Sequence, residues 1–129
     1  MTTSPAAKAS LATAMFTVSD QDAALAFYTG RLGWEVRSDT RFGPQGEQRW
    51  LEVAPAGSVA RLALNPPMGG APGGASIGIE VEDVLAEHAR LAAAGGVDLD
   101  PEPVQMDGAP LMFALRDPDG NWIWVVSPG

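Results

Sequence analysis

Few side chains in this sequence could hold a metal ion or act as a nucleophile. The 129 residues include one histidine, His88, and no cysteine. Catalytic zinc normally takes three histidine or carboxylate ligands, and non-haem iron oxygenases use two histidines and a carboxylate. Cysteine nucleophiles and disulfides are absent together. We therefore expect no catalytic residue, no metal and no cofactor.

The remaining candidates for chemistry have simpler explanations. His88 falls in the middle of a predicted helix, between Val84 and Leu91, where a partly buried packing histidine is expected rather than a ligand. Asp117 and Asp119 leave an all-carboxylate magnesium or calcium site open. The run from Asp117 to Asn121, however, reads Asp-Pro-Asp-Gly-Asn and is better explained as a tight turn.

Charge and composition restrict the partners. The formal net charge of −8 works against nucleic acid, because a polyanion needs clustered lysines and arginines. The same acidity favours a cationic small molecule. No apolar stretch is long enough to span a bilayer, and the polar start has no signal-like core. We expect a cytoplasmic protein without a membrane partner.

The elements that must position any site occur twice. Thr13 to Asp20 reappears as Ser76 to Asp83, shifted by 63 positions, and the match continues through a predicted helix to a glycine stop. Ser19 or Asp20 can cap the first helix, from about residue 21 to 32. Asp83 can cap the second, from about residue 84 to 94. Glycines at 33 and 95–96 supply the residues that end the helices.

Each predicted helix is followed by short extended segments, so the order β-α-β-β-β occurs twice. These segments are expected at about residues 34–40, 48–53, 60–64, 97–99, 111–116 and 122–126. The sequence therefore predicts an α+β fold of two tandem βαβββ modules, whose curled mixed sheets surround a cleft. Its parts are a flexible segment 1–11, a first module 12–65, a Pro/Gly linker 66–75 and a second module 76–129.

Two motifs resemble a known superfamily. The segment Phe16 to Glu35 resembles the opening of vicinal oxygen chelate proteins, and Arg116 to Asn121 resembles their closing turn. This superfamily contains glyoxalase I, extradiol dioxygenases, fosfomycin-resistance enzymes and bleomycin resistance proteins. The resemblance implies paired modules around one cleft, commonly in a homodimer that completes or flanks it. It is specific for the fold and says little about function.

The resemblance also implies where metal ligands would lie. Metal-using members take a ligand from the first strand of each module and a carboxylate or equivalent from the last. The first-strand positions match Thr13 and Ser76, and the last-strand positions match Ala63 and Trp124. None of these four residues is a competent ligand, so the family's metal site is expected to be missing.

If those positions face the cleft, strand alternation places further side chains on the same wall. Phe113 is expected there with less support from the pattern. Glu52 or Glu80, if desolvated among tryptophans, could work as a general acid or base with Arg61. The simpler interpretation is that either carboxylate anchors a ligand or forms a salt bridge. The predicted ligand-binding set is Thr13, Met15, Trp50, Glu52, Arg61, Ala63, Ser76, Glu80, Phe113, Trp122 and Trp124.

These residues favour a pocket for a planar organic ligand. The leading hypothesis is a metal-independent binding protein similar to bleomycin resistance proteins, which holds an aromatic and cationic ligand in the clefts of a homodimer. The second hypothesis is a glyoxalase- or dioxygenase-like enzyme with an atypical or absent metal site. The third is an accessory domain without chemistry.

Overall fold

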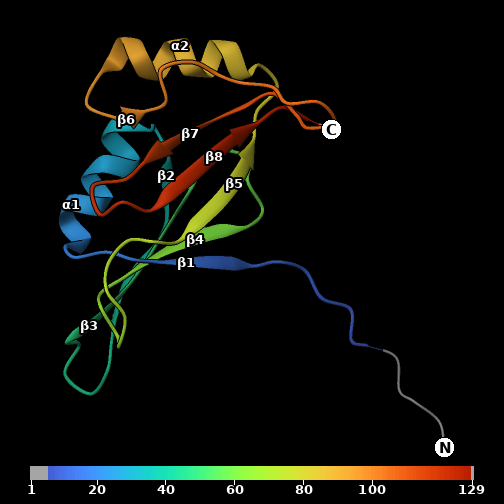
Figure 1. Ribbon diagram of the computed structural model, residues 1–129. Helices are drawn as coiled ribbons and strands as arrows, with labels where there is room; N and C mark the ends of the chain where they lie inside the picture. Colours follow the sequence, from blue (N-terminus) through green and yellow to red (C-terminus); the bar gives the residue numbers. More distant parts are fainter. Residues whose placement is uncertain (1–5, 129) are drawn as a thin grey trace, which may run out of the picture.

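The computed structural model describes residues 6–128, so residues 1–5 of the predicted flexible segment and residue 129 of the predicted second module lie outside the described part. The chain forms two four-stranded sheets, each built from one half of the sequence (Figure 1). The first half consists of β1 (Thr13–Thr17), α1 (Gln21–Ala26), η1 (Phe27–Arg31), β2 (Glu35–Phe42), β3 (Gln48–Ala54) and β4 (Arg61–Asn65). The second half consists of β5 (Ser76–Glu80), α2 (Val84–Ala94), β6 (Asp98–Leu99), β7 (Met112–Arg116) and β8 (Trp122–Val126).

The two sheets have the same topology. Their strand orders are β1-β4-β3-β2 and β5-β8-β7-β6. In each sheet the first strand of the half pairs in parallel with the last, and the other pairs are antiparallel. This arrangement confirms the predicted α+β fold of tandem βαβββ units. The first and last strands of each half are therefore neighbours.

The helices begin where the capping residues predict. The carboxylate of Asp20 accepts a hydrogen bond from the Ala23 backbone at 3.1 Å, and that of Asp83 accepts one from Ala86 at 3.0 Å. Gly33 and Gly95, at φ of 77° and 72°, follow the helical segments in a conformation that disfavours residues with a side chain. Both predicted helix starts are confirmed.

The first helix differs from its prediction in kind. Only Gln21–Ala26 is α-helical, and Phe27–Arg31 forms a π-helical turn in which the Leu32 N–H bonds to the Phe27 carbonyl, five residues back. This wider turn accompanies the burial of two consecutive aromatic residues, Phe27 and Tyr28. Sequence periodicity does not reveal the change, because a π-helical segment of 5 residues is too short to show a period of its own.

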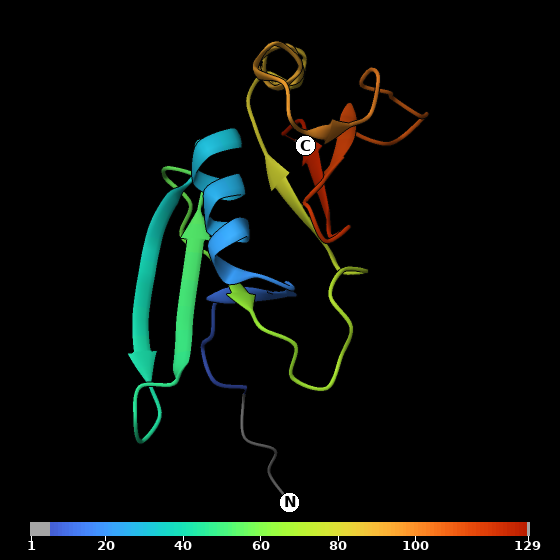
Figure 2. The same cartoon turned by 90° about the vertical axis from the view of Figure 1, so that its left-hand side faces the viewer.

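One hydrophobic core joins the two halves. Alternate strand residues such as Phe16 and Leu64 in the first half, and Ile123 and Val125 in the second, belong to a single cluster with the helices. Figure 2 shows α1 lying between β3 on one side and β5 on the other. The face of each sheet that packs in the core is therefore the face covered by helices.

A buried polar network fastens the second half to the first. The Tyr28 hydroxyl donates to Oδ2 of Asp117 at 2.9 Å, and both residues are almost completely buried. Asn121 donates from its side-chain amide to the backbone carbonyl of Thr17 at 3.0 Å. The Gly120 N–H donates to the Asp117 carbonyl at 3.0 Å, which confirms the predicted tight turn at residues 117–121 and places it at the junction of the halves. Among the described residues, no helix has the length and apolarity required to cross a bilayer.

Candidate functional site

The strand residues that point away from the core form one surface on each half, on the side of the sheet opposite the helices. In the first half, Phe16, Leu51, Leu62 and Leu64 enter the core, so their neighbours along each strand face the other way. We call this surface the first open face. It consists of Thr13, Met15, Thr17, Trp50, Glu52, Arg61 and Ala63.

A buried carboxylate lies at the centre of the first open face. The Glu52 side chain is only 5% exposed, although no helix covers this side of the sheet. Its ion pair is with Arg61, whose guanidinium is 3.7 Å away and whose side chain is 42% exposed. Ala63 pairs with Glu52 on one side and with Met15 on the other, and it has no side chain beyond Cβ. The centre of this face therefore holds a small side chain next to a buried carboxylate that is paired with Arg61.

The corresponding surface of the second half is aromatic. We call it the second open face. It consists of Ser76, Gly78, Glu80, Ala114, Arg116, Trp122 and Trp124. The rings of Trp122 and Trp124 have centroids 5.5 Å apart and planes inclined by 42°. In contrast to the first half, a large central residue, Trp124, is flanked here by two small ones, Gly78 and Ala114.

Arg116 belongs to this surface, although sequence reasoning did not include it. Its guanidinium carbon lies 4.8 Å from the centroid of the Trp122 ring. Its two terminal nitrogens donate to Asp100 at 2.7 Å and to Asp98 at 2.9 Å, and these bonds raise the pKa of Arg116 and lower that of Asp98. The pairing of Arg116 with Trp122 on adjacent antiparallel strands could have revealed it.

Phe113 does not belong to either open face. It is fully buried, on the helix-covered side of β7, and its ring meets that of His88 edge to face with centroids 4.9 Å apart. Nε2 of His88 is 2.8 Å from the backbone carbonyl of Asp100. The expectation that His88 is a packing histidine is confirmed. Phe113 is instead a core residue, because in β7 it is Ala114 and Arg116 that share the face of Trp124 and Trp122.

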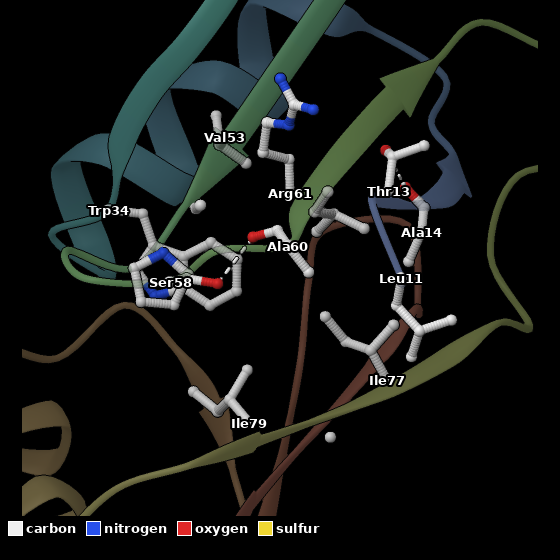
Figure 3. A pocket seen from close by; sticks show the side chains of 14 residues that line it. Leu11, Thr13, Ala14, Trp34, Val53, Ser58, Ala60, Arg61, Ile77 and Ile79 are labelled. Carbon is white, nitrogen blue, oxygen red and sulfur yellow. Dashed lines mark hydrogen bonds between the residues drawn. The ribbon is translucent and has the colours of Figure 1, made fainter. Parts of the chain in front are cut away.

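Within one chain the two open faces point apart. The core lies between the helix-covered sides of the two sheets, so the opposite sides face outward (Figure 2). Figure 3 shows the same relation locally: Ile77 and Ile79 of β5 point toward the first half, whereas Thr13 and Arg61 point away from them. A single chain therefore does not bring Thr13 together with Trp124.

A cavity of about 320 Å³ does lie between the halves, but it has a different lining. Leu11, Trp34, Ile77 and Ile79 provide apolar walls (Figure 3). The Ser58 hydroxyl at its rim already donates to the Ala60 carbonyl at 2.6 Å. Of the predicted set, only Thr13 and Arg61 contribute to this cavity. It is a recess at the end of the core rather than the predicted cleft.

The positions that would hold the metal of a vicinal oxygen chelate enzyme do not fit one. They carry Thr13, Ala63, Ser76 and Trp124, which offer two hydroxyls, a methyl group and an indole. Among residues 6–128, no three histidine or carboxylate side chains gather in a way that could hold a metal ion. The carboxylate of Asp117, the other candidate, is occupied by hydrogen bonds from Tyr28 and Asn121.

Ser76 lies within a short glycine-flanked motif. Residues 74–78 read Gly-Ala-Ser-Ile-Gly, the spelling of a nucleophile elbow. That elbow is a sharp turn from a strand into a helix, whereas Ser76 here is the first residue of β5. The chain's histidine lies in α2 and is engaged with Asp100, so the elbow's chemistry does not follow from the spelling.

Comparisons with known proteins agree with this geometry. The profile of the Glyoxalase/Bleomycin resistance protein/Dioxygenase superfamily matches residues 10–125. YetH of Bacillus subtilis (strain 168) is 36% identical over 107 residues, which cover 81% of this chain and 86% of YetH.

Two solved structures are similar over nearly the whole chain. A superfamily member from Sphaerobacter thermophilus DSM 20745 superimposes with a TM-score of 0.83 and 31% identity, covering 94% of this chain and 98% of that one. TnmS3, an antibiotic binding protein from Streptomyces sp. CB03234, also gives a TM-score of 0.83 and 31% identity, covering 97% of this chain and 100% of TnmS3.

Proposed function

Because this chain belongs to the Glyoxalase/Bleomycin resistance protein/Dioxygenase superfamily, we propose that it sequesters an aromatic, cationic small molecule without using a metal. The ligand we propose is an antibiotic, because the similar protein TnmS3 is an antibiotic binding protein. The lack of cysteine fits a reducing cytoplasm as the place of action.

The tilted tryptophan pair is the observation that carries this proposal. Trp124 occupies a position where the family resemblance implies a metal ligand, and it packs beside Trp122 on a surface that no helix covers. Exposed aromatic faces attract flat organic molecules and cations, whereas they are weak ligands for a metal. The Glu52 carboxylate on the first open face adds an anchor for positive charge, which it now offers to Arg61.

A homodimer would bring the two surfaces together. Since the open faces of one chain point apart, the first open face can only meet a second open face that belongs to another copy. β1 and β5 are edge strands of their sheets, and edge strands are commonly covered in native proteins. Met15 and Leu11, at and just before β1, are 56% and 89% exposed. Two symmetric clefts per dimer follow from this pairing.

Ligand titration of metal-depleted protein tests the proposal. Protein treated with a chelator is titrated with planar cations, planar neutral compounds and non-planar cations, while tryptophan fluorescence and equilibrium dialysis are followed. Because indole emission responds to stacked aromatic ligands, we expect quenching by planar cations and equal affinity before and after chelator treatment. Failure of the whole panel to bind contradicts the proposal. So does binding that disappears with the chelator and returns with a divalent metal.

A further inference from the structure

We infer that Gly78 and Arg116 determine specificity: Gly78 leaves one face of Trp124 open as a slot for a flat aromatic cation, and Arg116 fixes Trp122 as the wall of that slot. This inference rests on the proposed function and names the part of the second open face that selects the ligand.

The slot exists because Gly78 has no side chain. Gly78 is directly opposite Trp124 in the parallel pair of β5 and β8, so any side chain at position 78 would project on the same face as the indole. A Cβ built there touches only the Trp124 backbone oxygen, at 4.0 Å, and the φ angle of Gly78 is not positive. The backbone therefore does not require glycine here. What glycine provides is open space at position 78, on the strand next to Trp124.

The other side of Trp124 is closed. Ala114, its partner on β7, is fully buried and does not contact a ligand. An aromatic molecule of one ring's thickness can therefore lie over Gly78, against the exposed side of Trp124. At position 78, a side chain with branches at Cβ would occupy the volume that the aromatic molecule needs, whereas a methyl group would fill only the edge of that volume.

Arg116 supports the wall of the slot from behind. Its guanidinium stacks on Trp122, and its hydrogen bonds to Asp98 and Asp100 hold it there. Trp122 is 39% exposed, so without this support its ring would be free to change rotamer. Arg116 is a positioning residue, since it acts on the ligand through Trp122.

The charges around the slot favour a cation. One guanidinium is matched by two carboxylates, those of Asp98 and Asp100, which leaves an excess negative charge beside the aromatic pair. Glu80, on the same face, adds another exposed carboxylate. The faces of indole rings are themselves attractive to positive charge. A planar cation therefore gains from stacking and from charge together, whereas a neutral ring gains only from stacking.

Matched variants test the role of Gly78. Acridine orange, a flat tricyclic cation, is titrated against the wild-type protein, G78V, G78A and the linker control G70V. Gly70 has open space around it and an ordinary φ, so G70V makes the same chemical change away from the slot. We expect G78V to weaken binding by about tenfold or more, G78A by less than about threefold, and G70V not at all.

A test of Arg116 requires a measurement that would stay the same if the variant only lost stability. R116K keeps the charge but loses the planar, two-pronged contact. We expect R116K to weaken the binding of acridine orange by about three- to tenfold. We also expect it to diminish the far-ultraviolet exciton signal of the coupled Trp122 and Trp124 indoles. Its thermal unfolding transition should remain cooperative. The neutral analogue acridone is expected to bind about tenfold more weakly than acridine orange.

The outcomes separate the two proposals. If wild-type protein binds acridine orange and G78V binds it as well as G70V does, the slot is contradicted while the binding function stands. If R116K keeps both the affinity and the exciton signal, the positioning role is contradicted. Equal affinity for acridone and acridine orange contradicts the charge argument. If wild-type protein binds none of these probes or the wider panel, both the inference and the proposed function fail.

Discussion

The Tyr28 hydroxyl donates a 2.9 Å hydrogen bond to Oδ2 of Asp117, across 89 positions of sequence and across the junction of the two halves. Asp117 also accepts from the backbones of Asp119 and Asn121 and from the Asn121 amide. A carboxylate with so many donors can be buried, because each hydrogen bond offsets part of its desolvation. This contact ties the second half to the first, next to the hydrophobic core that the two halves share.

Removal of the Tyr28 hydroxyl should destabilise the fold. We expect Y28F to lose about 1–3 kcal/mol of unfolding free energy, because a buried charged acceptor loses one donor. Urea unfolding followed by circular dichroism measures the change. S58A is the control, since its hydroxyl bonds to Ala60 in an exposed loop and should matter less. Equal stability of Y28F and wild type would show that the contact is dispensable.

High pH should destabilise the protein through the same residue. Burial, and then the negative charge of Asp117, raise the pKa of Tyr28, while its pKa in the unfolded chain is about 10. The unfolded state therefore releases a proton that the folded state keeps, and stability falls above pH about 10. Tyr28 is the chain's one tyrosine, so near-ultraviolet absorbance reports its ionisation alone. Tyrosinate should appear only as the circular dichroism signal is lost. Its appearance in folded protein would refute this account, and Y28F should lack the effect.

The buried carboxylate of the first open face should contribute to affinity for cations. E52Q removes the charge but keeps the size, and we expect it to weaken binding of a planar cation by about tenfold. E47Q makes the same change in the exposed turn before β3 and should leave affinity unchanged. Isothermal calorimetry of both variants measures the difference. Indistinguishable affinities for E52Q and E47Q would exclude Glu52 from the site.

Metal should be neither bound nor required. Because the four ligand positions carry Thr13, Ala63, Ser76 and Trp124, we expect protein purified without chelators to contain less than about one tenth of a transition metal per chain. Elemental analysis by mass spectrometry measures this content directly. Stoichiometric nickel, zinc, manganese or iron would support the enzyme hypothesis instead.

Local signals in the sequence were enough to predict the elements. Asp20 and Asp83 cap their helices because a carboxylate before an apolar periodic segment satisfies free backbone N–H groups. Strand alternation placed Trp122 and Trp124 on one face and Ile123 on the other, as the structure has them. These features depend on neighbouring residues only.

Features that depend on distant residues could not be predicted. The pairing of β7 with β8 could have placed Arg116 beside Trp122, but its bond to Asp98 requires the register of β6 with β7, which no local pattern gives. The divergence of the open faces depends on how the two halves pack through their shared core and the Tyr28–Asp117 contact, which no local pattern reveals. The prediction of Phe113 at the cleft is wrong, because a shift of one residue along a strand moves a side chain to the other face, and Phe113 lies in the core.

The most direct test of the central claim is complementation between two defective variants. M15R places a bulky cation on the first open face, and W124A removes the indole from the second open face. Light scattering first establishes that each variant forms a dimer, with a mass of twice the 13.4 kDa of one chain. We expect neither variant alone to bind a planar cation. If each cleft combines the first open face of one chain with the second open face of its partner, subunit exchange creates mixed dimers with one intact cleft each, and binding returns. Binding that stays absent after exchange is established would contradict a cleft shared between two copies.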